Sequence, residues 1–383
     1  MSKKIGRVYL FELLLFLLVI LGELPKIYVL YDLEILVHIT NFIQFPLYVG
    51  LMYQVIRQQC SLKQFVLFSV IGILLLIGYI VSSQAAYVRG LMLILAVKDI
   101  PFKRMLHVCR VAMTSMFCVT VILWMLRLSD SGIGIKGKPA FGYIHSNIAA
   151  QVAMIIFLLW LTEKGEKVGR REYIIIEIAA ILLFVFTGSK TATSIMAAAP
   201  ILSEICKKAF QCDKRKSLVF WGIEIAQAMI LLFTWWSARL LANVSFLKRL
   251  DLMVTNRLFL NYYLFDKYSL KLFGQNVTLQ ESTSVYNNIQ DVWGAVITCD
   301  NTYVMSLLIM GILPTIIFLL GYVFLVRKAI RQRDRSVVVA AMLLALYAFC
   351  ESQLVEIYNN FVYLYILAAP TVCRQERMKI YDS

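Results

Sequence analysis

The sequence predicts an all-α, polytopic membrane protein with about 10–12 transmembrane helices and one large extracytoplasmic loop. Mean hydropathy is +0.75, 60% of the residues are hydrophobic and 16% are charged, whereas a soluble domain has about 25% charged residues. Apolar runs recur along nearly the whole chain, and the single long polar interruption spans residues 239–301. We therefore expect residues 1–383 to form one integral membrane domain that carries this loop.

A helix needs about 20 mostly apolar residues to cross a bilayer. On that basis the candidate spans are residues 8–24, 35–56, 64–82, 85–98, 105–128, 144–162, 172–187, 191–205, 218–238, 302–326, 337–354 and 357–373. The fourth, seventh, eighth and twelfth are short enough to be re-entrant or interfacial segments instead. No cleavage site follows the first apolar run, so we expect it to be a membrane span and not a signal peptide.

The basic residues predict the topology. With the N-terminus inside, alternate connections and the two ends of the chain hold 25 of the 38 Lys and Arg residues. Cytoplasmic loops are enriched in these residues, so both termini are expected in the cytoplasm. The net charge of +15 then reflects topology and not a nucleic-acid partner. The eight cysteines show no paired spacing, so we expect neither a disulfide framework nor a zinc site.

The loop at 239–301 is predicted to lie outside, although it is basic. It contains Arg239, Lys248, Arg249, Arg257, Lys267 and Lys271. Long loops translocate largely regardless of charge. Positive charge at an outer membrane surface suits an anionic substrate, such as a diphosphate attached to a lipid. Solvation or pairing with lipid headgroups is the alternative, and it explains the lysines better than Arg257.

Two shorter polar segments border apolar runs. In the first, residues 138–147, His145 and Asn147 fall at the start of the sixth span. They are candidate substrate contacts, and helix capping by Asn147 or an interfacial histidine explains them too. In the second, residues 186–193, Lys190 follows a Thr-Gly-Ser turn. An ammonium at a helix N-terminus opposes the helix dipole, which favours an anionic partner, whereas snorkelling to headgroups is the alternative.

Two further segments lie within the large loop or at its end. Residues 255–266 have the pattern of an amphipathic helix on the membrane surface, with Arg257 and Asn261 on one face. An arginine so held can bind a phosphate through two donors. Asp300 and Asn301 precede the tenth span. They either cap its helix, or Asp300 serves as a general base or positions an acceptor.

Two acidic residues near the last outer turn, Glu351 and Glu356, are functional hypotheses by default because ionisable groups are rare at this depth. The sequence assigns neither of them a specific role.

Four segments in this order resemble the O-antigen polymerase and ligase superfamily, and specifically Wzy-type polysaccharide polymerases. They are FGYIHSN, TGSKTA, NRLFLNYYLFDKYSLKLFGQN and DNTYVMSLLIMGI. The resemblance covers roughly residues 100–370. This chain has Lys190 where the family usually has arginine and Asn276 where it usually has glycine. Asp300 stands where related ligases tend to have histidine, which favours a polymerase.

The resemblance implies a GT-C-like glycosyltransferase of the bacterial cell membrane. It would join polyprenyl-diphosphate-linked oligosaccharide repeats on the outer membrane face without metal or cofactor, releasing polyprenyl diphosphate. Flippase and chain-length regulator proteins would be its partners. The resemblance implies diphosphate stabilisation by Arg257, assisted by Lys190, Arg239 or Arg249, and acceptor engagement by Asp300. Sugar or headgroup contacts would come from Asn301, Asn147, His145 and Asn261.

Two other functions stay open at this point. A ligase that moves a finished glycan to another acceptor would share the fold and donor site. A flippase or transporter for lipid-linked oligosaccharide usually shows inverted repeats and intramembrane charges. This sequence has no evident repeat and few mid-span charges, Arg89 and Glu224 being the main ones.

Overall fold

The computed structural model describes residues 2–31, 34–129, 137–211, 213–254, 256–277 and 299–369, and within them it is almost entirely helical, with no β-strand. The main helices are α1 (Ser2–Glu23), α3 (Glu34–Ile56), α4 (Leu62–Ser82), α5 (Ala86–Ala96), α6 (Phe102–Met125), α7 (Ser146–Lys164), α8 (Arg170–Thr187), α9 (Lys190–Gln211), α10 (Asp213–Leu240), α11 (Ser245–Met253), α12 (Arg257–Lys267), α14 (Ile312–Arg331) and α15 (Arg335–Ala348).

Six helices in the described part of the chain are long and apolar enough to span a membrane. They cover Gly6–Lys26, Leu62–Ser82, Phe102–Met125, Ser146–Lys167, Leu218–Leu240 and Ile312–Arg331. The helices α5 and α15 are apolar but shorter. The prediction of an all-helical membrane protein is thus confirmed at this level, while the count of ten to twelve spans stays a prediction.

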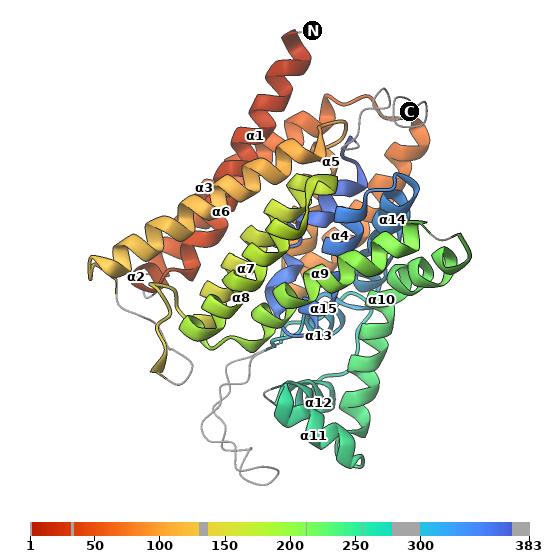
Figure 1. The fold of residues 1–383 in the computed structure, drawn as a ribbon. Coiled ribbons are helices and arrows are strands. Elements are labelled where there is room, and N and C mark those ends of the chain that lie inside the picture. The colour runs from red at the N-terminus through yellow and green to blue at the C-terminus, as the bar shows by residue number, and fades with distance from the viewer. Residues whose placement is uncertain are drawn as a thin grey trace.

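The bundle has two chemically different ends. One end, termed the basic end, holds residues 57–61, 97–101, 165–169 and 332–334. Hydrogen bonds connect its segments: Arg7 donates to the Lys98 carbonyl, and the Lys98 ammonium donates to the Gln59 carbonyl. The opposite end, termed the loop end, holds residues 24–27, 137–145, 239–277, 299–301 and 349–351. Figure 1 shows the N-terminus of α1 at one end and α11 and α12 at the other.

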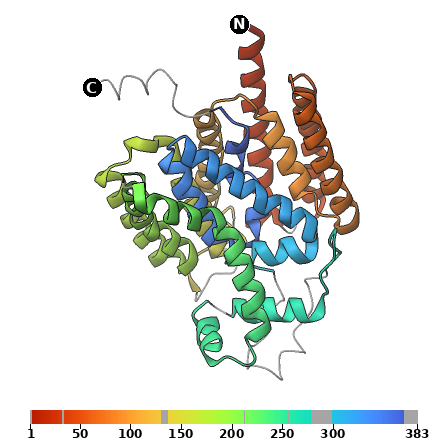
Figure 2. The same ribbon diagram turned by 90° about the vertical axis from the view of Figure 1, so that its right-hand side faces the viewer.

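The central helix of the bundle is α15, in which nearly every residue from Val337 to Ala348 is buried. It contacts α9, α14, α10 and α7. In the view of Figure 2, the helices of residues 213–267, coloured green to teal, extend from the bundle toward the loop end. Helices on the rim expose apolar faces, such as Ile174, Ile178 and Ile181 of α8, as expected where lipid tails replace water.

The predicted span at 302–326 is interrupted. It begins as α13 (Thr302–Met305), continues as the π-helical turn Ser306–Met310 and breaks at Gly311 before α14. The loop segment 271–275 lies against this break. Gln275 N–H donates to the Ile309 carbonyl at 3.1 Å, and Leu313 N–H donates to the Leu272 carbonyl at 3.0 Å. The loop therefore satisfies backbone groups that an unbroken helix would pair internally.

Two glycines make this close contact possible. Gly274 has φ +83° and Gly311 has φ +100°, values that L side chains rarely adopt. A Cβ at Gly274 would lie 2.0 Å from the Ile309 carbonyl oxygen, and one at Gly311 would lie 2.2 Å from the Gly274 nitrogen. The -LFG- and -MGI- segments of the sequence are thus two halves of one backbone contact.

The last two predicted spans are also corrected. The segment predicted at 337–354 is α-helical only to Ala348. The described part of the segment predicted at 357–373 contains no α-helix, and residues Phe361–Ile366 within it form a 3₁₀ helix. Another 3₁₀ turn, Ser352–Val355, precedes this segment. Side chains replace the missing backbone bonds: the Asn360 amide donates to the Leu354 carbonyl, and Lys328 Nζ donates to the carbonyls of Tyr365, Ile366 and Ala368. Irregular backbone at membrane depth is tolerated where protein surrounds it, as here.

We predict that Gly274→Ala and Gly311→Ala each disrupt the fold. The left-handed backbone alone costs a residue with a Cβ about 1–2 kcal/mol, and the clash with backbone atoms adds to it. The measurement is the thermal midpoint and the size-exclusion profile in detergent. The control is Gly222→Ala in α10, whose Cβ would meet nothing within 4 Å. Wild-type stability of either interface variant would refute the backbone contact.

Candidate functional site

Four separate segments converge at the loop end. They are the start of α7 with His145, the start of α12 with Arg257, residues 299–301 before α13, and the turn after α15 with Glu351. In the sequence, Asp300 follows Arg257 by 43 residues and Glu351 follows it by 94 residues. Only the tertiary fold brings them together, and we term the side chains of His145, Arg257, Asp300 and Glu351 the Arg257 cluster.

The orientation of Arg257 is set by a buried carboxylate. Asp251 Oδ1 accepts hydrogen bonds from the backbone N–H groups of Leu258 and Phe259, at 2.8 and 3.2 Å. This capping satisfies the first turn of α12, where Asn256 itself makes no side-chain cap. Leu258 and Leu264 then pack into a small apolar core with Val304 of α13. The helix is therefore docked on the protein, and its polar face, with Arg257 and Asn261, is buried as well.

Arg257 is only 5% exposed. One terminal nitrogen donates to the Asp300 carbonyl oxygen and the other to Glu351 Oε1, each at 3.1 Å. Three other buried N–H groups on these residues and their neighbours have no partner among the described residues: Arg257 Nε, Asn261 Nδ2 and Asn301 Nδ2. Buried donors are normally satisfied, so the arrangement has spare capacity for a ligand rich in oxygen acceptors.

The structure separates the roles of Asp300 and Asn301. Asn301 Oδ1 caps α13 by accepting from the N–H groups of Tyr303 and Val304, at 2.9 and 3.2 Å. Helix capping therefore accounts for the side chain of Asn301 but not for that of the half-buried Asp300. The Asp300 carboxylate instead interacts electrostatically with His145, Arg257 and Glu351. Thr302 Oγ1 donates to the Glu351 carbonyl at 2.5 Å, which fixes residues 300–302 against the turn after α15.

His145 is the N-cap of α7. Its Nδ1 accepts from the Asn147 backbone N–H at 3.0 Å. Burial lowers the pKa of His145, while the Asp300 carboxylate opposes and the Arg257 cation reinforces that effect. The lowered pKa favours the neutral imidazole. Because Nδ1 is an acceptor, the proton of that neutral form lies on Nε2. His145 can thus donate a hydrogen bond from Nε2 but is not placed to accept a proton. Asn147 contributes its backbone to this cap, and its side chain is half-buried.

Glu351 is the residue whose role the sequence did not reveal. Its side chain is 12% exposed. Burial raises the pKa of the Glu351 carboxyl to about 7, even though Arg257 beside it acts in the opposite direction, and Asp300 raises the pKa further. A carboxyl that exchanges its proton near neutral pH is suited to acid–base chemistry. The only signal in the sequence was an acidic residue directly after an apolar helix.

The three other predicted basic site residues lie away from the Arg257 cluster and are exposed. Lys190 is the first residue of α9 and is exposed, Arg249 is exposed on α11, and Arg239 is exposed at the end of α10 with its guanidinium over the Trp235 ring at 5.3 Å. These cations are exposed at the loop end, whereas Arg257 is buried and held by hydrogen bonds. They suit attraction of an anionic ligand better than its fixed orientation.

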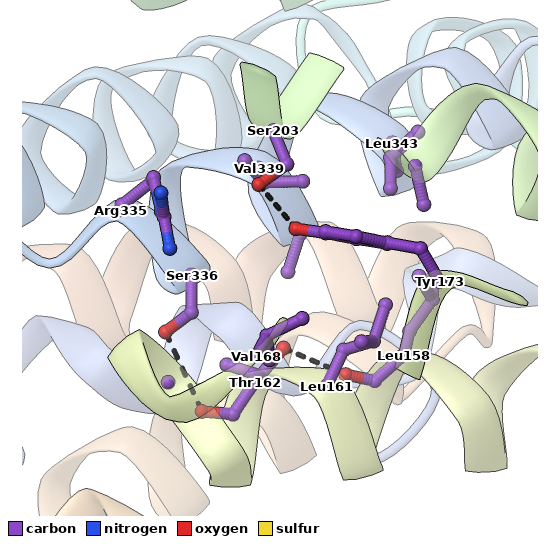
Figure 3. A pocket seen from close by; sticks show the side chains of 13 residues that line it. Leu158, Leu161, Thr162, Val168, Tyr173, Ser203, Arg335, Ser336, Val339 and Leu343 are labelled. Carbon is purple, nitrogen blue, oxygen red and sulfur yellow. Dashed lines mark hydrogen bonds between the residues drawn. The ribbon is translucent and has the colours of Figure 1, made fainter. Parts of the chain in front are cut away.

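Two cavities formed by the described residues lie at the basic end, away from the cluster. One lies between α7, α8, α9 and α15 and is lined by Tyr173, Ser203 and Arg335 among others (Figure 3). Its volume of about 20 Å³ is enough for roughly one water molecule. The other, of about 300 Å³, lies between α3, α4 and α5, where its polar residues Gln58 and Lys98 already bond to backbone carbonyls.

No protein-family model matches this chain, and no curated protein or solved structure does so either.

The cap and the donor role of His145 can be separated by substitution. Asparagine is a good N-cap but lacks the imidazole, so His145→Asn should keep the thermal midpoint of wild type and weaken ligand binding. His145→Ala should lower the thermal midpoint and also weaken ligand binding. The missing cap should reduce the free energy of unfolding by about 1 kcal/mol. Differential scanning fluorimetry with and without a lipid diphosphate measures both quantities. Full ligand response in His145→Asn would show that the residue is only a cap.

Proposed function

We propose that the chain is a polysaccharide polymerase of the O-antigen polymerase type. It transfers a growing glycan from polyprenyl diphosphate to a hydroxyl of a second polyprenyl-diphosphate-linked repeat. The observation that supports this most is the Arg257 cluster, in which a buried arginine, two carboxyl groups and the His145 imidazole meet at one point of the loop end. Unpartnered donors of Arg257, Asn261 and Asn301 add to it. The order of the four sequence segments, which resembles that family, supports it independently.

The location of the cluster fits a lipid-linked substrate. Lys and Arg are concentrated in the connections at the basic end, and such residues favour the cytoplasmic side. The loop end then faces outward, at one edge of the six apolar helices. A polyprenyl chain can remain in the bilayer while its diphosphate reaches Arg257.

The reaction needs charge stabilisation more than bond activation. The bond between the anomeric carbon and the diphosphate oxygen breaks, and the oxygen takes the electron pair. The acceptor hydroxyl oxygen forms the new glycosidic bond and gives up its proton. Arg257 binds the developing diphosphate charge in a buried setting, where such contacts are strong. Asp300 and the His145 Nε2–H position the acceptor, and Asn261 and Asn301 donate to substrate oxygens.

Purified protein in nanodiscs, given a lipid-diphosphate-linked repeat, should produce a ladder of longer lipid-linked glycans on a gel. Arg257→Lys keeps the charge but loses the forked donor geometry. We expect it to lower the rate at least about 100-fold, the typical loss of one oriented donor to developing charge. The control is Arg331→Ala, an exposed arginine at the basic end, which should retain the ladder.

The alternatives give different results in the same experiment. Wild-type protein that yields no ladder but moves intact lipid-linked repeat across a sealed vesicle would be a flippase. Transfer of preformed glycan to a different acceptor, with no lengthening of repeats, would indicate a ligase. Arg257→Lys changes the contact with the buried Glu351 carboxylate, so monodispersity of each variant is checked first.

A further inference from the structure

The Arg257 cluster has a feature that diphosphate binding alone does not require. Its arginine is already paired with a carboxylate, at 3.1 Å, and both side chains are largely buried. An anionic ligand must therefore compete with Glu351 for the guanidinium. In its ionised form the Glu351 carboxylate would also repel the ligand. A site evolved only to hold diphosphate would be better served by a neutral residue at this position.

We propose that Glu351 is the general base that removes the proton from the acceptor hydroxyl, and that this proton transfer releases Arg257 to the departing diphosphate. This inference rests on the proposed polymerase function. In the ground state the Arg257 charge is shared with the Glu351 carboxylate. When the acceptor hydroxyl proton moves to Glu351, the carboxyl becomes neutral. The guanidinium then interacts with the oxygen that receives the electron pair of the breaking bond, and the proton later passes to water.

Glu351 suits this role better than Asp300. Arg257 contacts the backbone carbonyl of Asp300, not its carboxylate, so protonation of Asp300 would not release a hydrogen bond of Arg257. Glu351 instead provides the acceptor atom for one of the two Arg257 bonds. Its backbone is held in place by Thr302, and its side chain lies on the short turn between α15 and the 3₁₀ turn at Ser352.

The groups that act on Glu351 come from three other elements and its own turn. They are Arg257 of α12, Asp300 before α13, Tyr347 of α15 and the adjacent Cys350. Arg257 opposes protonation of Glu351, whereas burial and Asp300 favour it. The resulting pKa of about 7 lets the carboxyl be ionised before the reaction and hold a proton after it.

The test compares binding with turnover in the same protein. Glu351→Gln keeps the size of the side chain and an oxygen that can accept from Arg257, but it cannot take up a proton. We expect turnover to fall at least 100-fold, while binding of a polyprenyl diphosphate becomes several-fold tighter because the competing charge is gone. A merely structural role would weaken binding and turnover together.

The pH dependence gives a second readout. In wild type the turnover rate should rise with pH between 6 and 8 as Glu351 ionises, and diphosphate binding should weaken over that interval as the carboxylate competes for Arg257. Glu351→Gln should lose both trends, and Glu351→Asp should retain them with a shifted midpoint. The matched control is Glu356→Gln, which removes another carboxylate paired with an arginine, Arg89, from the same segment. It should leave the pH profile unchanged in shape.

The outcomes distinguish this inference from the proposed function. A wild-type ladder with undiminished turnover in Glu351→Gln would overturn the inference and leave the polymerase function standing. Absence of any wild-type ladder would overturn the polymerase function and, with it, the base role. Loss of both binding and turnover in a monodisperse Glu351→Gln protein would show that Glu351 only holds Arg257 in position. That result would also overturn the inference.

Discussion

The pairing of Arg257 with Glu351 is the interaction on which the loop end depends. Burying one charged group alone costs several kcal/mol, whereas a hydrogen-bonded pair largely offsets that cost. The pair joins α12, which belongs to the large loop, to the turn that follows the central helix α15. Residues 300–302 complete the junction, because they bond to both partners. The same pair that joins the loop to the bundle therefore also brings the Arg257 cluster together.

A second constraint comes from backbone that is not helical at membrane depth. Residues 352–369 and the break at Gly311 would be unstable against lipid, where unpaired peptide groups are costly. Here protein surrounds them: α14, α15 and the 271–275 segment pack against them, and asparagine and lysine side chains bond to their carbonyls. The irregular backbone positions Glu351 at the loop end and Glu356 close to Arg89, which a straight helix through this region would not do.

Much of the fold could be predicted from the sequence, because lipid imposes a simple rule on composition and length. The apolar runs predicted the long helices from α1 to α10, with ends that differ by up to six residues, but not the short helix α2. The charged connections predicted two distinct ends. Local patterns failed where distant segments intervene. Gly311 and Pro314 are weak local signals of a break within residues 302–326. The partner that stabilises the break, the 271–275 segment, lies more than 30 residues earlier in the sequence. Likewise residues 357–373 are apolar enough for a helix, but Lys328 and two asparagines stabilise 3₁₀ turns instead.

The candidate site was partly predictable for the same reason. Arg257 and Asn261 share a helix face, which spacing alone reveals, and Asp300 lies next to a capping asparagine. The proximity of Glu351 to Arg257 is a property of the tertiary structure, since 94 residues separate them. The sequence also suggested the basic residues Lys190, Arg239 and Arg249 as candidates. They are exposed in the structure, and a charge without burial does not create a fixed binding geometry.

The most direct test of the central claim is the binding of a polyprenyl diphosphate by native mass spectrometry, with the corresponding free alcohol as control. If Arg257 holds the diphosphate, wild-type protein will bind the diphosphate in preference to the alcohol. Arg257→Gln will then lose this preference, by about 100-fold or more in affinity, the value of two or more charge-assisted hydrogen bonds. Equal binding of the alcohol, or an undiminished preference in Arg257→Gln, would contradict the account.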